Sequence, residues 1–177
     1  MEFLNTIKQR IPETAKDIRL NFDSVIARSS LSADDALGCA LAAAVAAKSP
    51  VLVAAFKANM PAPIAQGALV AAGLMAMNNV WYPFVEMAED EDLKTQRAEL
   101  RMNAYATSGG VEKKQFEAYA LAASIVGKCH FCVKSHYALL QKEGLTTTQL
   151  RDIGRIAAVV SAAATVLAAE VEEPVAA

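Results

Sequence analysis

Cys129, Cys132 and His136 fall at helical spacing in the second half of this chain. On a helix at 100° per residue, Cys132 lies about 60° from Cys129, and His136 lies about 20° from Cys129 on the opposite rotation. All three side chains therefore share one helix face. Because cysteines at positions i and i+3 can reach the ~5.5 Å Cα separation that a disulfide prefers, the spacing predicts a thiol–disulfide pair.

The residues around this pair favour a reactive thiolate. Gly127 lets the chain turn before the helix, so free backbone N–H groups and the positive end of the helix dipole face Cys129. His136, one turn after Cys132, can take a proton from that thiol, directly or through a water. Glu117, on the preceding predicted helix, is a candidate to orient the imidazole and so complete a Cys–His–Glu relay.

Simpler interpretations of the same residues stay open at this point. The two cysteines and His136 could bind zinc, although the chain has only one other histidine, His130, and no second Cys-x-x-Cys pair. A thioredoxin motif is disfavoured because no βαβ pattern surrounds the pair. Unreactive core cysteines are disfavoured because a helix start is expected to expose them. His136 could be a structural histidine, and Glu117 could be a solvated carboxylate.

The sequence also predicts whether His130, Phe131 and Cys39 are exposed or buried. His130 lies about 100° from Cys129, so we expect it to be exposed beside the site, an auxiliary candidate rather than a central one. Phe131 lies about 200° round, where it is expected to pack into the core. Cys39, within an alanine-rich segment, is predicted to be a small buried hydrophobe.

The composition predicts an all-α, single-domain helical bundle over residues 1–177, with the redox motif in its second half at about 111–170. Hydrophobic residues make up 54% of the chain but aromatic residues only 6%, and alanine, the best helix former, accounts for much of the excess. A formal net charge of −2 gives no reason to expect nucleic acid or an anionic membrane as partner.

We also expect a cytoplasmic protein. The longest clean apolar stretches, such as 156–169, are shorter than the ~20 residues that a bilayer requires, so no membrane span is predicted. The amino terminus lacks the basic region and apolar core of a signal peptide. Three cysteines without a secretory signal are typical of a reducing compartment, where a close pair is more often catalytic than structural.

Helix signals recur along the chain, and the alternation typical of strands is almost absent. Pro12 is predicted to open one helical segment, and Pro50 is predicted to restart the chain after another. The other predicted helices are 32–48, 64–80, 111–126, 129–142 and 149–170. Thr147 or Thr148 is expected to cap the last helix. The acidic run 86–92 is predicted to be a solvated face or loop, and the tail 172–177 is predicted to be frayed.

The sequence contains an internal similarity. Residues 41–48 (LAAAVAAK) align with residues 121–128 (LAASIVGK) 80 positions later, and four of the eight pairs are identical. This predicts a duplicated helical unit. The continued register makes these pairs: Leu37 with Glu117, Ser49 with Cys129, Leu52 with Cys132, and Phe56 with His136. The second copy would thus carry reactive side chains where the first carries inert ones.

The pattern Glu117, eleven residues, Cys129-x-x-Cys132-x-x-x-His136 resembles the signature of the carboxymuconolactone decarboxylase-like superfamily. Within it, the chain is most similar to the redox-active alkyl hydroperoxidase D branch. The likeness covers most of the chain and includes three flanking segments: 11–18, 75–80 and 100–103.

This resemblance implies an all-α fold with a repeated helical unit, assembly as a homotrimer or larger ring, and a role in peroxide defence. By analogy, Cys132 would attack the peroxide, an exposed Cys129 would close the disulfide, and His136 and Glu117 would relay protons. No bound cofactor is implied. The reductant would be a lipoyl group on a 2-oxoacid dehydrogenase component, and electrons could pass to a peroxiredoxin.

One position departs from the family pattern. The branch typically has a histidine immediately before its second cysteine, where this chain has Phe131. The departure affects the prediction of a two-histidine relay, the efficiency of peroxide turnover and the identity of the reductant. It leaves the two cysteines intact.

The residues therefore favour a thiol-dependent hydroperoxide reductase that works by a dithiol/disulfide cycle. The alternative is a disulfide reductase or electron-transfer adaptor between a lipoyl or thiol donor and a peroxiredoxin, with little direct peroxidase activity. A lactone-acid decarboxylase would not need two cysteines one turn apart. A non-enzymatic oligomeric scaffold would rest only on the alanine-rich apolar faces.

Overall fold

A computed structural model describes residues 1–170 of the chain. Over that range the chain folds into α-helices and two short 3₁₀ helices, without a strand, which confirms the all-α prediction. The elements are α1 (Phe3–Arg10), η1 (Glu13–Ala15), α2 (Lys16–Ala27), α3 (Ala33–Ala46), α4 (Pro50–Lys57), α5 (Ala62–Ala88), α6 (Glu91–Thr95), α7 (Asn103–Ala106), η2 (Ser108–Gly110), α8 (Lys113–Val126), α9 (His130–Lys142) and α10 (Thr147–Ala169). The predicted frayed tail, 172–177, lies outside the described residues.

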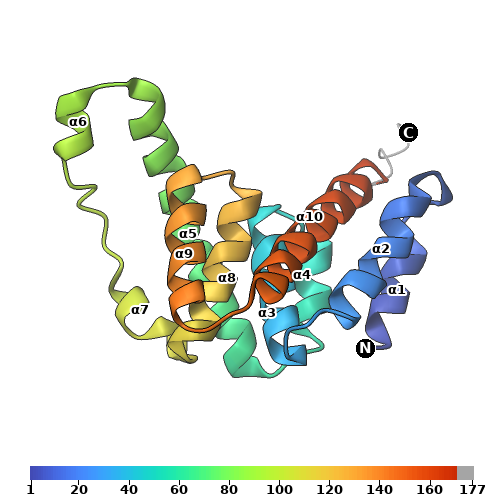
Figure 1. The fold of residues 1–177 in the computed structure, drawn as a ribbon. Coiled ribbons are helices and arrows are strands. Elements are labelled where there is room, and N and C mark those ends of the chain that lie inside the picture. The colour runs from blue at the N-terminus through green and yellow to red at the C-terminus, as the bar shows by residue number, and fades with distance from the viewer. Residues whose placement is uncertain (171–177) are drawn as a thin grey trace.

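Helices α3, α5 and α8 pack against one another at the centre of the molecule, and α10 packs across α2, α3 and α8. In Figure 1, α1 and α2 lie at one end of the molecule, and α6 and α7 lie at the other. The segment 89–107 leaves the end of α5, carries α6 and α7, and returns to η2, which packs on α5. We call this segment the arm.

Small side chains allow the central helices to approach closely. Residues 36–44 of α3 are all buried, and so are residues 116–124 of α8. Because alanine side chains are small, the two helices can lie close together, and alanine also has the highest helix propensity. At Gly38, even a Cβ atom would overlap the ring of Tyr119, so the approach of α8 to α3 requires glycine there.

The internal duplication predicted from the sequence is confirmed. Helix α3 corresponds to α8, and α4 corresponds to the start of α9. Between the paired helices, Lys48 and Lys128 both take left-handed backbone conformations, with φ of 56° and 55°. The next residue caps the following helix in each copy: the Ser49 Oγ accepts from the Leu52 N–H, and the Cys129 Sγ accepts from the Cys132 N–H.

The end of α5 and the cap of α10 differ from the prediction. Helix α5 continues to Ala88, well past the predicted end near Val80, with Pro83 inside it. The acidic run therefore begins in the last turns of α5 and continues into α6. Thr146, rather than a later threonine, caps α10, because its hydroxyl accepts from the Gln149 N–H and the Gln149 side chain accepts from the Thr146 N–H.

The sequence predicts that no apolar stretch is long enough to span a membrane, and the lengths of two helices contradict this. Helices α5 and α10 are both long and apolar enough to cross a bilayer by length and composition. Half of the apolar window of α10 is buried inside the protein, against 22% for α5. Since core helices of soluble proteins meet the same criterion, the two helices are weak evidence for a membrane protein.

Asp152 ties α10 to the segment before α3. Its carboxylate, 2% exposed, accepts hydrogen bonds from the N–H and hydroxyl of Ser30 at 2.8 and 2.9 Å and from Arg155 at 3.1 Å. Burial alone would raise the pKa of Asp152, but these bonds and one from Arg151 lower it to about 2. We expect Asp152→Asn to lower the free energy of unfolding by about 2 kcal/mol at pH 7, measured by urea denaturation.

The pH dependence of this effect has a definite sign. The folded-state pKa of Asp152 lies below its ordinary value of 3.8, so the stabilisation is fully present above about pH 4 and is lost as the pH falls toward 2. Wild type and Asp152→Asn should therefore converge in stability in that window. Asp23→Asn, which removes a partly exposed ion pair with Lys8, is the control and should cost less than about 1 kcal/mol. Equal losses for the two variants would contradict the prediction.

Candidate dithiol site

Cys129 and Cys132 are joined by a disulfide at the start of α9, with their Cα atoms 5.3 Å apart. Cys129 is the N-cap of the helix, and its Sγ accepts a hydrogen bond from the backbone N–H of Cys132 at 3.3 Å. The sulfurs therefore lie at the positive end of the α9 dipole, where a thiolate is favoured. The predicted pairing of the two cysteines is confirmed as geometry.

The predicted exposure of Cys129 was wrong. Cys129 is 0% exposed and Cys132 is 2% exposed. Helix α5 packs against α9 and covers the helix start, so that the Cys129 Sγ lies 3.8 Å from the backbone oxygen of Asn78. A helix start is open in an isolated helix, but here a neighbouring helix closes it. Of the two cysteines, Cys132 lies on the wall of the recess described below.

Glu117 and His136 meet in the interior. The His136 Nδ1 lies 2.6 Å from the Glu117 Oε2, and the two residues are 5% and 0% exposed. Glu117 is thus a buried partner of the imidazole and not a solvated helix carboxylate. Burial would raise the pKa of Glu117, but hydrogen bonds from His136 and Tyr105 outweigh it and hold the pKa below its ordinary value.

An ionised Glu117 fixes the state of the imidazole. Because the carboxylate only accepts hydrogen bonds, the proton of a neutral His136 must sit on Nδ1, which leaves the lone pair on Nε2. The Nε2 lies 3.2 Å from the Met75 Sδ. A thioether cannot donate, so this contact becomes a hydrogen bond only when Nε2 carries a proton. Within residues 1–170, no hydrogen bond joins His136 directly to Cys132, so a proton passing between them requires a water or a small ring movement.

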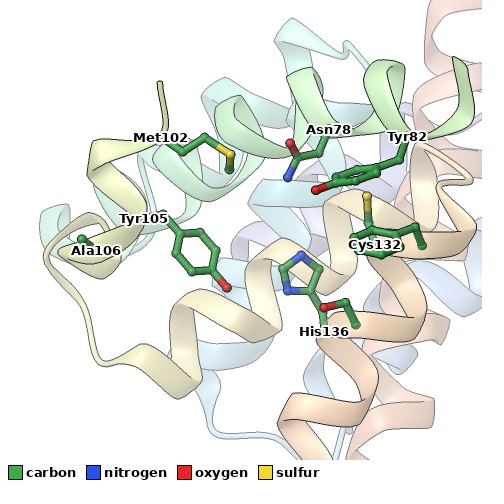
Figure 2. Close-up of a pocket in the computed structure, with 9 residues that line it drawn as sticks. Asn78, Tyr82, Met102, Tyr105, Ala106, Cys132 and His136 are labelled. Carbon is green, nitrogen blue, oxygen red and sulfur yellow. The ribbon is translucent and has the colours of Figure 1, made fainter. Parts of the chain in front are cut away.

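Cys132 and His136 line a common recess of about 380 Å³. Its walls come from α5, the arm and α9, and comprise Asn78, Tyr82, Met102, Tyr105, Ala106, Phe131, Cys132, Ser135 and His136. Figure 2 shows Tyr105 and His136 projecting toward each other, with Cys132 and Tyr82 beyond them. The recess is mainly apolar and aromatic, with the sulfur and the imidazole as its chemically active groups.

The helical spacing predicts that Phe131 packs into the core, and this prediction was wrong. Phe131 is 55% exposed and stacks on Tyr82 of α5, with ring centroids 4.1 Å apart. The buried face of α9 carries Cys132, His136 and Leu140, so the opposite face points outward to solvent and to the projecting end of α5. The aromatic residue at the position that departs from the family pattern therefore forms a rim of the recess.

His130 and Cys39 lie where the sequence predicts them. His130 is peripheral: its side chain is 80% exposed and its Nδ1 lies 3.0 Å from the Glu86 Oε1. Cys39 is fully buried, and burial followed by the charge of Asp35 raises the pKa of its thiol. Among residues 1–170, no three His, Cys, Asp or Glu side chains converge as a set of metal ligands.

The motif alone missed several residues of the site. Met75 and Asn78 come from α5, and Met102 and Tyr105 come from the arm. None has a spacing relation to the cysteines, because each is brought to α9 by packing. The one available signal was the family likeness of segments 75–80 and 100–103, which contain all of these except Tyr105.

Comparison with known proteins agrees with this geometry. Residues 91–171 match the model of the Carboxymuconolactone decarboxylase family. The chain is 42% identical to the alkyl hydroperoxide reductase AhpD of Maricaulis maris, over 94% of this chain and 98% of that protein. It is 38% identical to the AhpD of Rhodopseudomonas palustris (91% of each chain) and 38% identical to the AhpD of Streptomyces coelicolor (94% and 96%).

Proposed function

The chain belongs to the alkyl hydroperoxide reductase AhpD family, and we propose that it reduces organic hydroperoxides through a Cys129–Cys132 dithiol/disulfide cycle in peroxide defence. The observation that supports the cycle is a disulfide whose Cys132 lines the same recess as His136, the imidazole that is paired with the buried Glu117. A dithiol to carry the electrons and an imidazole to accept the proton would thus share one recess.

The proposed cycle has two steps. The Cys132 thiolate attacks the terminal oxygen of the hydroperoxide, the O–O bond breaks, and an alcohol leaves after taking a proton, while Cys132 becomes a sulfenic acid. The Cys129 thiol then attacks that sulfur, water leaves, and the disulfide forms. Two electrons from an external dithiol restore the pair. The assignment of Cys132 as the attacking residue rests on its place beside His136 in the recess, whereas Cys129 borders a separate hollow with His130 and Val133.

Glu117 and His136 are proposed to move the protons of this cycle. With its Nδ1–H held by Glu117, His136 can accept the Cys132 thiol proton at Nε2 and later return it to the leaving alkoxide. The Met75 thioether sulfur would then accept a weak hydrogen bond from the protonated Nε2. This bond would stabilise the imidazolium between uptake of the thiol proton and its return to the alkoxide.

The lining of the recess favours an organic hydroperoxide over hydrogen peroxide. Tyr82, Phe131 and Met102 provide apolar surface in the recess, and the volume of about 380 Å³ exceeds that of a small peroxide. Burial of an alkyl or aryl group contributes roughly 25 cal/mol per Å² of apolar area, which hydrogen peroxide cannot gain.

The family relationship supports partners that the chain itself does not contain. We propose an external lipoyl group or another thiol as reductant, a peroxiredoxin as a second electron acceptor, and a cytoplasmic location. No bound cofactor is needed for the cycle, because the disulfide is the redox group.

The decisive test is stopped-flow oxidation of the reduced protein by cumene hydroperoxide and, in parallel, by hydrogen peroxide. We expect faster reaction with the organic hydroperoxide and a disulfide between Cys129 and Cys132 on mass spectrometry of the product. Consumption of peroxide only after a peroxiredoxin is added would instead support an electron-transfer adaptor. No oxidation of the cysteines in either arrangement would reject the dithiol cycle.

We further propose that the protein is a homo-oligomer and that the outer face of α5 lies in the subunit contact. This α5 ridge comprises Met77, Val80, Trp81, Phe84, Met87 and, from the arm, Leu100. Val80 and Met87 are 70% and 76% exposed, which leaves an apolar strip open to solvent in one chain. Contiguous exposed apolar surface of this kind marks an interaction site.

A charge placed on the α5 ridge is expected to dissociate the oligomer. Burial of a glutamate in an apolar contact carries a desolvation cost of several kcal/mol, so Val80→Glu and Phe84→Glu should sediment as monomers. Leu20→Glu is the control, because Leu20 is an isolated exposed residue, 53% exposed, on α2 at the other end of the molecule. A monomeric wild type, ridge variants of unchanged mass, or recruitment of the wild type to lipid vesicles would each contradict this assignment.

A further inference from the structure

Tyr105 lies in the recess but belongs to neither the Cys-x-x-Cys motif nor the Glu–His pair. It sits on α7 in the arm, and its hydroxyl donates a hydrogen bond to the Glu117 Oε1. His136 occupies the other carboxylate oxygen, Oε2. The two oxygens of a fully buried carboxylate are therefore each held by one donor, from two elements that are distant in sequence.

We propose that Tyr105 is a positioning residue of the dithiol site, which keeps the buried Glu117 ionised and thereby holds His136 in the tautomer that can accept the Cys132 proton. This inference rests on the proposed function, in which that proton transfer starts the cycle.

The chemistry follows from the inventory of donors. A buried carboxylate with one unpaired oxygen is costly in its charged form, and it lowers that cost by taking up a proton. A protonated Glu117 would become a hydrogen-bond donor, and His136 would have to accept at Nδ1 and carry its own proton on Nε2. In that tautomer, Nε2 has no lone pair to take the thiol proton. The Tyr105 hydroxyl prevents this exchange.

Tyr105 is suited to the role because it stays a donor. Burial, together with its hydrogen bond to Glu117, raises the pKa of the phenol well above its ordinary value, so it does not ionise in the working range. Its ring packs edge-on against Phe116, one residue before Glu117, with centroids 5.5 Å apart. This contact fixes the ring independently of the hydroxyl, so the ring should keep its place when the hydroxyl is removed.

The groups that act on the Glu117 carboxylate are few. They are Tyr105 from the arm, His136 from α9 and, along its own helix, Lys113. Within residues 1–170, the packed helices α3, α5 and α10 add no further charged group to this set. A change in the protonation of Glu117 on removal of the Tyr105 hydroxyl would therefore not be masked by a neighbouring carboxylate.

The test measures the reactivity of the reduced thiol directly, so it does not depend on peroxide. In a Cys129→Ser background, the rate at which Cys132 attacks 4,4′-dithiodipyridine is followed from pH 4 to 8. We expect Tyr105→Phe to move the acid limb of this profile to higher pH by about one unit, the effect of losing one hydrogen bond to a charged group. Tyr137→Phe is the matched control, because Tyr137 is half-buried on α9 outside the recess, and it should leave the profile unchanged.

A second comparison tests the route through Glu117. In a Glu117→Gln background, Tyr105→Phe should have no additional effect on the profile, since there is no carboxylate left to protonate. An unshifted profile for Tyr105→Phe, or an additional shift in the Glu117→Gln background, would overturn the inference. If the disulfide reagent reacts as expected while cumene hydroperoxide does not, the peroxidase proposal fails and the positioning role of Tyr105 stands.

Discussion

Cys132→Ser is expected to lower the rate of hydroperoxide reduction by about 10³-fold or more, to the level of the uncatalysed reaction. A serine hydroxyl is not ionised near neutral pH and cannot attack the O–O bond as a thiolate does. Serine is close to cysteine in size, so the fold should persist although the position is buried. The measurement is stopped-flow oxidation by cumene hydroperoxide with the dithiol-reduced protein.

Cys129→Ser is the matched variant, because it removes the other sulfur of the same disulfide. It should permit one oxidation per subunit and then stop, since the sulfenic acid on Cys132 has no thiol with which to condense. A dimedone-type probe should label Cys132 in this variant and nothing in Cys132→Ser. Labelling of Cys129 in the Cys132→Ser protein would reverse the two roles.

His136→Phe is expected to lower the rate at pH 7 by about 10²-fold, the usual contribution of a positioned general base. Phenylalanine occupies similar space but cannot accept the thiol proton, and it leaves the buried Glu117 without one of its donors. The rate should therefore recover as the pH rises and hydroxide ionises the thiol without help. A complete pH–rate profile of hydroperoxide reduction measures both effects.

The control for this variant is His130→Phe. His130 is exposed, and within the described part of the chain its ring bonds only to Glu86 at the surface, so its loss should leave the profile close to that of the wild type. A profile for His136→Phe that keeps the wild-type shape would remove His136 from the mechanism. Similar losses of rate in both variants would indicate that the exposed edge of the site around Phe131 contributes as much to the rate as the buried Glu117–His136 pair.

The duplicated unit explains why the candidate site lies in the second copy. In the first copy, Phe56 takes the place of His136 and packs with Phe3 and Phe22 of α1 and α2, at ring-centroid distances of 6.1 and 6.3 Å. Two helices thus cover the face that corresponds to the recess-lining face of α9. In the second copy the arm and α5 border that face and leave a recess between them.

The sequence by itself determined the features that depend on near neighbours in the chain. Helix starts at Ser32 and Cys129, the shared face of the two cysteines and His136, and the repeat at 41–48 and 121–128 all follow from spacing, capping and composition within a few turns. Such local preferences survive folding because each helix satisfies its own backbone hydrogen bonds.

Only the tertiary structure decided which surfaces are covered. Cys129 is buried and Phe131 exposed, the reverse of the expectation from an isolated helix, because α5 covers one side of α9 and leaves the other open. The partners of the Glu117–His136 pair, Met75 and Tyr105, come from segments with no spacing relation to the motif. Side-chain burial and long-range hydrogen bonds depend on how helices pack, which no periodicity within a single helix encodes.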